Sequence, residues 1–159
     1  MKNKSAIASD TWLTPIDFYL PLNDRFGFAN FDPCPADNDI FLFDGLKVDW
    51  MDRTYCNPPY SRKIKEDFII KAHKQSLQNK LVVLLLPVST STKIFHNLIL
   101  PNAKVEFLKG RLKFEGIDGD GNWVNPNCGM GSLKNIPENA KQVNRSGQND
   151  NMIVIFGEE

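Results

Sequence analysis

The stretch Leu81-Val82-Val83-Leu84-Leu85-Leu86, closed by Pro87, is the longest apolar run in this chain of 159 residues. A strand that is apolar at every position is typical of the centre of a sheet whose two faces are both covered. The run is too short to cross a lipid bilayer, which needs about 20 apolar residues. We therefore predict a buried central strand over residues 81–86.

Shorter patterned segments lie on both sides of this strand. Helices are expected at 16–26, 64–77 and 91–100. Strands are expected at 28–31, 40–43, 55–56, 104–108, 111–114 and 152–156. Residues 115–150 are rich in Gly, Asn and Pro, and are expected to form a long flexible loop. Strands that alternate with helices predict a single α/β domain over residues 1–159, a three-layer sandwich with a largely parallel sheet.

Two helix ends carry recognisable signals. Thr14 has the side chain of a helix cap, and Pro15 is expected in the first turn of the helix that follows. Pro101 is expected to stop the helix at 91–100 because proline has no backbone N–H to continue it.

Composition restricts the class of protein. A hydrophobic content of 42% and a charged content of 24% are those of an ordinary globular domain. Three widely spaced cysteines argue against a disulfide framework, and with two histidines they show no zinc-ligand spacing, so no metal is expected. The first residues lack the apolar core of a signal peptide, and we expect a cytoplasmic protein without a membrane anchor.

The formal net charge is zero, but the charges are segregated along the chain. Residues 1–52 hold four Lys or Arg and nine Asp, residues 53–113 hold twelve and three acids, and residues 114–159 hold three and seven acids. A basic middle third suits a phosphate backbone, although solvated helix and strand faces are the alternative. The candidate contacts to a nucleic-acid backbone are Ser61, Arg62, Lys63, Lys65, Arg111 and Lys113.

The tetrapeptide Asn57-Pro58-Pro59-Tyr60 follows the expected strand at 55–56. Two prolines fix two φ angles and remove two backbone donors, which leaves carbonyl oxygens free to face a cleft. The Asn57 amide oxygen and the Pro58 carbonyl suit an exocyclic amino group, and Tyr60 suits the face of its ring. Asn-Pro also commonly opens a turn, so the pattern alone leaves both interpretations open.

A second polar element, Asp32-Pro33-Cys34, also follows an expected strand. Ligands of such sheets bind at the carboxyl ends of the strands, so both elements are expected to open onto one edge. Asp32 suits the ribose hydroxyls or the ammonium group of a nucleoside cofactor, or is simply a turn residue. Trp12 is either a packing residue or an exposed stacking surface.

Five segments in order carry a family resemblance. They are Thr11-Trp12-Leu13-Thr14-Pro15, Phe31-Asp32-Pro33-Cys34, Cys56-Asn57-Pro58-Pro59-Tyr60-Ser61, Leu84-Leu85-Leu86-Pro87 and Gly110-Arg111-Leu112-Lys113-Phe114. With them the chain resembles the phage-type DNA N6-adenine methyltransferases, the Dam-like family. The resemblance implies S-adenosylmethionine as methyl donor, adenine in double-stranded DNA as acceptor, and a Rossmann-like methyltransferase fold. It also implies a phage or prophage origin and action in a bacterial host cell.

The resemblance also implies roles for individual residues. The catalytic element is Asn57, Pro58, Pro59 and Tyr60, and the cofactor contacts are Trp12, Thr14, Pro15, Asp32, Pro33, Cys34 and Asn57. Only 25 positions separate Asp32 from Asn57, and a βαβ crossover takes at least about 10–12 residues, so the sheet is expected to be abridged.

Three alternatives stay open at this point. The same clamp suits a methyltransferase of RNA adenine or of protein glutamine. Pro35 and Ala36 follow Cys34 where related enzymes often have small residues or glycines, which leaves open a nucleic-acid-binding relative without catalysis. The sequence indicates neither the target site, nor the strand preference, nor the oligomeric state.

Overall fold

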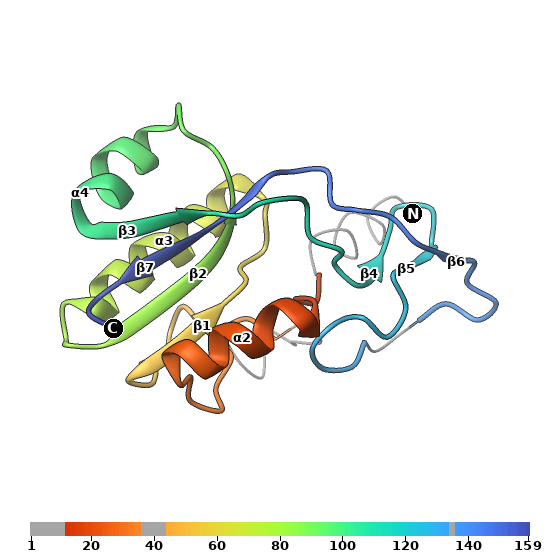
Figure 1. Cartoon of the computed structure of the whole chain (residues 1–159), viewed down its shortest axis with the longest axis horizontal. Coiled ribbons are helices and arrows are strands. Elements are labelled where there is room, and N and C mark those ends of the chain that lie inside the picture. The colour runs from red at the N-terminus through yellow and green to blue at the C-terminus, as the bar shows by residue number, and fades with distance from the viewer. Residues whose placement is uncertain (1–11, 36–43, 134–135) are drawn as a thin grey trace.

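The computed structural model describes residues 12–35, 44–133 and 136–159. This part of the chain forms a four-stranded sheet flanked by helices and a smaller three-stranded sheet beside it (Figure 1). The protein is therefore of the mixed α/β class that the sequence predicts. The strand expected at 40–43 lies outside the described residues.

The larger sheet has the strand order β1-β2-β7-β3. Its strands are β1 (Arg53–Cys56), β2 (Leu81–Pro87), β7 (Asn151–Phe156) and β3 (Ala103–Phe107). β1 and β2 pair in parallel, whereas β7 is antiparallel to both of its neighbours. The prediction of largely parallel pairing was wrong, because the chain returns into β7 from the carboxyl edge of β2, where Asn151 pairs with Pro87. Of the strands predicted here, 55–56, 81–86, 104–108 and 152–156 are confirmed.

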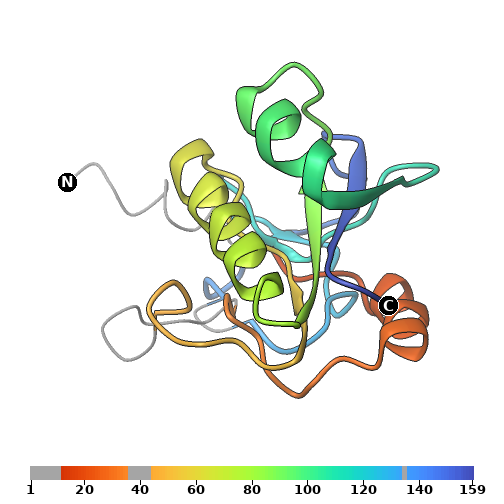
Figure 2. The ribbon, with the colours of Figure 1, turned by 90° about the vertical axis from the view of Figure 1, so that its left-hand side faces the viewer.

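Both faces of this sheet are packed, as expected for a central strand that is apolar throughout (Figure 2). On one face Val82, Leu84 and Leu86 of β2 pack with α3 (Arg62–Ser76) and η1 (Phe95–Ile99). On the other face Leu81, Val83 and Leu85 pack with α2 (Ile16–Phe26). Burial of these side chains on both faces is the main force that holds the sheet together.

The smaller sheet is formed by β4 (Gly116–Ile117), β5 (Trp123–Val124) and β6 (Gln142–Val143). β4 and β5 pair antiparallel, and β5 and β6 pair in parallel. The sequence predicts a loop over this whole region, so its secondary structure was missed. Strands of two residues leave too short an apolar pattern to be recognised.

Two further predicted strands do not form, although the structure describes their residues. Residues 28–31 and 111–114 have no strand pairing. Phe28 belongs to a ring cluster instead, in which it lies 5.6 Å from Phe26 and 5.5 Å from Tyr55 between ring centroids, and Phe31 packs against the core cluster on the other face of the sheet. Phe114 likewise packs into the core beneath Tyr60 without joining a sheet.

The helices occur where they are expected, but two of their ends differ. Pro15, not Thr14, occupies the N-cap position of α2, and the Thr14 hydroxyl bonds to the Tyr55 hydroxyl instead. The third helix is not stopped by Pro101. It includes a π-helical turn at η1 and continues through α4 (Leu100–Asn102), so that Pro101 lies within its last turn. The π turn shifts the hydrogen bonding of the helix just before the residue that lacks an N–H.

Candidate active site

The Asn57–Tyr60 element lies at the carboxyl end of β1, the edge strand that runs parallel to β2. At the same edge β2 ends at Pro87, and β7 begins opposite it at Asn151. The segment that contains Trp12 and Thr14 bridges this edge and the smaller sheet. Leu13 and Glu115 pair their backbones at 2.8 and 3.2 Å, and the Met130 N–H donates to the Thr14 carbonyl at 2.7 Å.

The Asn57 amide is held by one end only. Its Nδ2 donates to the Trp12 carbonyl oxygen at 2.8 Å, which fixes the orientation of the group. Its Oδ1 is buried and has no hydrogen-bond partner among the described residues. A buried acceptor without a partner costs about 1–3 kcal/mol, so such a group is expected where a ligand supplies the missing donor.

Asn151 is a second amide with the same property, and it was not predicted from the sequence. Its Nδ2 donates to the Tyr60 hydroxyl and to the Leu86 carbonyl, both at 3.2 Å, while its Oδ1 is buried without a partner among the described residues. The available signal was a polar residue immediately before the apolar run at 152–156.

Tyr60 is fixed from two sides. Its ring meets that of Phe114 edge to face, with 6.2 Å between centroids and 84° between planes, and its hydroxyl accepts from Asn151. Burial raises the pKa of Tyr60 above its ordinary value, so the phenol is neutral at physiological pH. A neutral ring held in this way suits stacking rather than proton transfer.

The expected cofactor residues gather around the end of β1. Thr14 Oγ1 lies 2.7 Å from the Tyr55 hydroxyl. Burial raises the pKa values of Tyr55 and Cys56, and the nearby charge of Asp32 adds to both shifts. Asp32 also accepts the Cys34 N–H at 2.8 Å. The structure therefore brings Trp12, Thr14, Asp32 and Cys34 to the carboxyl end of β1, beside Asn57.

Two other expected cofactor residues, Pro15 and Pro33, make contacts that also serve the fold. Pro15 forms a backbone bridge with Gly129 of the smaller sheet region. Pro33 packs tightly on Gly45, where a Cβ would lie 1.8 Å from the Pro33 carbonyl oxygen. These contacts neither require nor exclude a ligand.

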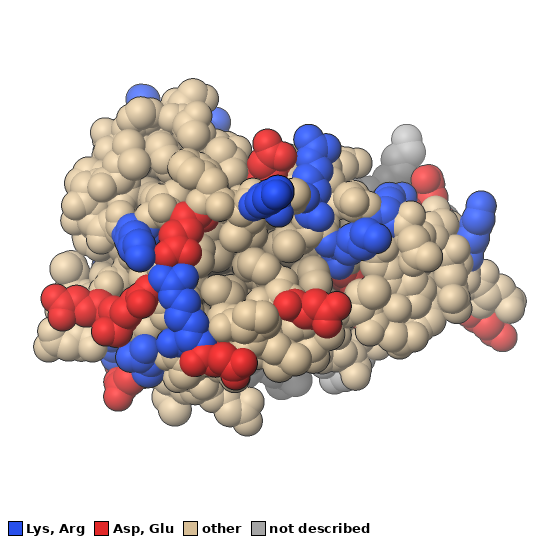
Figure 3. Space-filling view, in the orientation of Figure 1, with Lys and Arg blue, Asp and Glu red and all other residues tan. Residues whose placement is uncertain are grey.

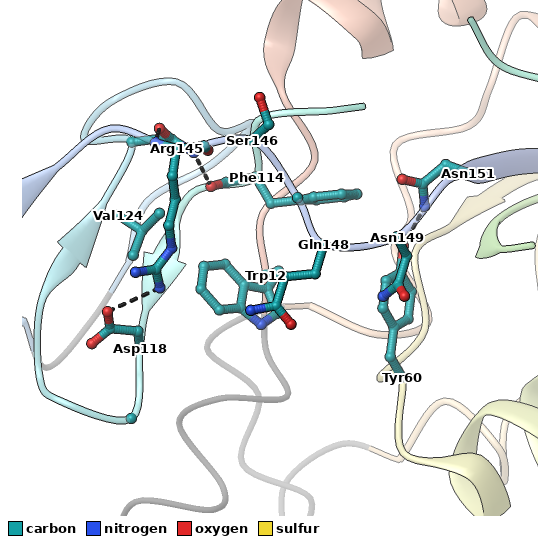
Figure 4. Close-up of a pocket in the computed structure, with 13 residues that line it drawn as sticks. Trp12, Tyr60, Phe114, Asp118, Val124, Arg145, Ser146, Gln148, Asn149 and Asn151 are labelled. Atoms are coloured by element: carbon teal, nitrogen blue, oxygen red, sulfur yellow. Dashed lines mark hydrogen bonds and ion pairs between the residues drawn. The ribbon is translucent and has the colours of Figure 1, made fainter. Parts of the chain in front are cut away.

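A cavity of about 370 Å³ opens between the two sheets (Figure 4). Asn151 of β7 and Tyr60, which follows β1, line it on the side of the larger sheet. Trp12 lies between Tyr60 and the side chains of Asp118 and Arg145, and Phe114 also lines the cavity. Gly116 backs the indole so closely that a Cβ would lie 2.4 Å from a carbon of the Trp12 ring. The cavity is thus lined by aromatic faces with an unpaired amide acceptor at its edge, a combination that suits a planar base.

Three of the expected DNA contacts form ion pairs with acidic side chains. Arg62 pairs with Glu66 at 3.5 Å, Lys63 with Asp67 at 3.9 Å, and Arg111 with Asp150 at 3.3 Å. The other three expected DNA contacts, Ser61, Lys65 and Lys113, have different surroundings. Ser61 is neutral and precedes α3, Lys65 and Arg62 line a second cavity of about 430 Å³ beside β2, and Lys113 is exposed after β3. In Figure 3 several basic side chains gather over the connection between the two sheets.

An Asn-Pro-Pro-Tyr element thus follows β1 directly, at the edge of an α/β sheet. The chain belongs to the DNA N-6-adenine-methyltransferase (Dam) family, whose model matches residues 2–159. No curated protein and no solved structure matches the chain. Family membership supports DNA adenine-N6 methylation as the general activity, with DNA as substrate.

Two kinds of feature are absent from the described residues. No helix in them is both long and apolar enough to span a membrane. No group of three or more His, Cys, Asp or Glu side chains in them is arranged to hold a metal ion.

Proposed function

We propose that this protein transfers a methyl group from S-adenosylmethionine to the exocyclic amino group of an adenine flipped out of double-stranded DNA. The observation that carries the proposal is Asn57 Oδ1 at the carboxyl end of β1, which is buried and has no partner among the described residues. An amino hydrogen of adenine is the donor that this oxygen lacks. Family membership supports the same reaction.

Asn57 and Pro58 would make the amino nitrogen nucleophilic. The lone pair of that nitrogen is delocalised into the adenine ring, which makes it a poor nucleophile in solution. When Asn57 Oδ1 and the Pro58 carbonyl accept its two hydrogens, the nitrogen is favoured in a pyramidal geometry and its lone pair is localised. The Asn57 orientation is already set by its bond to the Trp12 carbonyl, so little reorganisation is needed.

The residues near the end of β1 fit S-adenosylmethionine. When bound, this cofactor supplies an electrophilic methyl group on a sulfonium. Asp32 carries the carboxylate that suits its hydroxyl or ammonium groups, and the charge of Asp32 already acts on Tyr55 and Cys56 beside Asn57. Trp12, Thr14 and Cys34 would complete the contacts. We infer an abridged Rossmann-like fold in which this edge of the sheet holds the cofactor.

The aromatic part of the cavity would receive the flipped base. Flipping costs a few kcal/mol, and stacking on an aromatic side chain recovers about 1–3 kcal/mol per base. Tyr60 is held ready for this by Phe114 and Asn151. Asn151 Oδ1 adds a second acceptor at the edge of the cavity, which favours a base with an amino group.

The test is expression in a bacterial host that lacks adenine methylation, followed by mass spectrometry of digested DNA. We expect N6-methyladenine with the wild-type chain, at least ~100-fold less with Asn57→Ala, and an unchanged amount with Asn97→Ala, a change at an exposed asparagine of η1. Titration with S-adenosylmethionine shows whether each variant still binds the cofactor.

Two results would overturn the proposal. A folded wild-type protein that binds S-adenosylmethionine but leaves DNA unmodified would exclude DNA as the substrate, and the same assay on RNA and on protein extract would then identify the alternative. A protein that shows no saturable cofactor binding would be a nucleic-acid-binding relative without this chemistry.

A further inference from the structure

Arg145 is the most firmly held cation of the described residues beside the cavity. Its backbone is clamped by the side chain of Asn125, which is 1% exposed. The Arg145 N–H donates to Asn125 Oδ1 at 2.9 Å, and Asn125 Nδ2 donates to the Arg145 carbonyl at 2.7 Å and to the Phe114 carbonyl at 2.8 Å. One buried amide therefore ties Arg145 to the residue that packs against Tyr60.

The side chain of Arg145 is fixed as well. Its Nη2 donates to Asp118 Oδ2 at 2.9 Å, and Asp118 is in turn held by the backbone N–H groups of Asp120 and Asn122 at 3.0 and 2.9 Å. Burial alone would raise the pKa of Asp118, but these donors and Arg145 outweigh it and hold the pKa at about 2. Asp118 is therefore ionised at physiological pH and keeps the guanidinium in one orientation.

This arrangement leaves part of the guanidinium available. Within the described chain the side chain of Arg145 makes its only hydrogen bond through Nη2, and it is 47% exposed. Because Asp118 offsets its charge, Arg145 offers a set of directed N–H donors rather than strong attraction to any phosphate. A planar guanidinium in a fixed orientation matches the O6 and N7 acceptors of guanine.

Arg145 also lies close to the place proposed for the flipped base. It lines the same cavity as Tyr60, with Trp12 between the two, and Gln148 and Asn149 come from the same strand connection (Figure 4). A base stacked on Tyr60 would place its DNA neighbours within reach of the smaller sheet. The described part of the chain contains no separate domain that could read the sequence around the adenine.

We propose that Arg145, oriented by Asp118 and Asn125, reads a guanine next to the methylated adenine, so that the smaller sheet is the sequence-reading element of this enzyme. The inference rests on the proposed function and adds the determinant of its target site. It predicts that the methylated site contains one fixed guanine, and that recognition of this guanine depends on Arg145.

The test maps N6-methyladenine by sequencing in a plasmid library with random bases around adenine, modified by four forms of the protein. The forms are the wild type, Arg145→Lys, Arg145→Gln and Lys141→Gln, where Lys141 is an exposed residue beside β6 that does not line the cavity. We expect both Arg145 variants to lose about 5- to 150-fold of the discrimination for guanine at one position, and Lys141→Gln to keep the wild-type site. Thermal melting confirms that each form is folded.

Arg145→Lys decides between a base and a phosphate, because it keeps the charge and its attraction to Asp118 but loses the planar fork. If Arg145→Lys keeps the wild-type site and Arg145→Gln weakens methylation equally at all sequences, Arg145 contacts a phosphate and the inference is overturned. A wild-type site without a fixed guanine, or an unchanged site in both folded variants, would also overturn it. If the wild type itself produces no N6-methyladenine, the proposed function fails, and this result is distinct from all the others.

Discussion

The two sheets of this protein are held together by different forces. In the larger sheet the buried side chains of β2 and β7 are apolar apart from Asn151. In and around the smaller sheet Glu115, Asp118 and Asn125 are buried, and each is bonded several times. The Glu115 carboxylate, for example, accepts from the Trp123 indole N–H at 2.8 Å and from the Gly129 N–H at 3.0 Å.

This difference shows how a short chain can build a site. The apolar sheet provides a rigid edge for Asn57 and Tyr60, whose geometry the proposed chemistry requires. The polar sheet forms the other wall of the cavity with little apolar surface, and directed hydrogen bonds fix the side chains that face it. The proposed active site lies at the junction of the two, where Trp12 contacts both.

The largest effect is expected from a cavity in the apolar sheet. Leu84 is 0% exposed, and Leu84→Ala is expected to lower the free energy of unfolding by about 2–5 kcal/mol. Leu77→Ala, at a leucine that is 72% exposed after α3, is the matched control and should cost little. Urea denaturation measures both variants. A loss below 1 kcal/mol at Leu84 would contradict apolar burial as the force that holds this sheet.

A smaller and more local effect is expected from the polar sheet. Asn125→Ala removes the partners of the Phe114 carbonyl and of both backbone groups of Arg145, which should cost about 2–3 kcal/mol. Hydrogen exchange should increase at residues 114–125 and 142–146 and remain slow in β2 and β7. Asn97→Ala serves as the control, because Asn97 is exposed. Equal loss of protection in both sheets would mean that they unfold as one unit.

The same contrast explains what the sequence could predict. Leu81–Leu86 was identified as a central strand because burial on both faces needs an apolar side chain at every position, and a pattern of this kind is local. The role of Asn125 and Asp118 depends on partners 20 and 27 positions away, and their side chains alone are typical of loops. Tertiary contacts, not local pattern, decide such positions.

The residues of the candidate site also differ in whether a local sequence pattern indicates them. Asn57 and Tyr60 could be proposed from the sequence because a contiguous motif carries them, and only the structure shows that Asn57 Oδ1 has no hydrogen-bond partner among the described residues. Asn151 and Arg145 were missed because each reaches the site from a distant strand or connection. Neither Thr14 nor Phe114 could be placed from the sequence, since a hydroxyl pair with Tyr55 and an edge-to-face contact with Tyr60 leave no local signature.

Two glycines of the smaller sheet region offer a matched test of the contact between the sheets. A Cβ at Gly116 would lie 2.4 Å from the Trp12 ring, whereas a Cβ at Gly119 would meet nothing within 4 Å. Gly116→Ala is therefore expected to cost about 1–2 kcal/mol and to displace the indole from the cavity. Thermal denaturation and the rate of methyl transfer measure the two effects. Gly119→Ala should change neither, and equal behaviour of the two variants would show that Trp12 does not depend on this contact.

The smallest effect is expected from pH, and it compares one carboxylate in each region. The Arg25 guanidinium, aided by Lys104, holds the pKa of Glu106 on β3 at about 2, and Asp118 also has a pKa of about 2. Both are lowered from ordinary values of 4.5 and 3.8, so the unfolded chain binds more protons than the folded chain between these limits. The stability that they contribute is complete above about pH 5 and is lost as the pH falls through about 2.

Glu106→Gln and Asp118→Asn should each make stability depend less on pH between pH 5 and pH 2. Thermal denaturation over this range measures the effect. Glu106 is partly exposed, and its pair with Arg25 is worth about 1 kcal/mol or less, so its replacement should shift the whole transition only slightly. Asp118 is nearly buried and holds the polar sheet, so its replacement should mainly remove the acid sensitivity of residues 116–124 and 142–145. If acid opened the larger sheet first, the polar contacts of the smaller sheet would not be the part of the molecule that responds to pH.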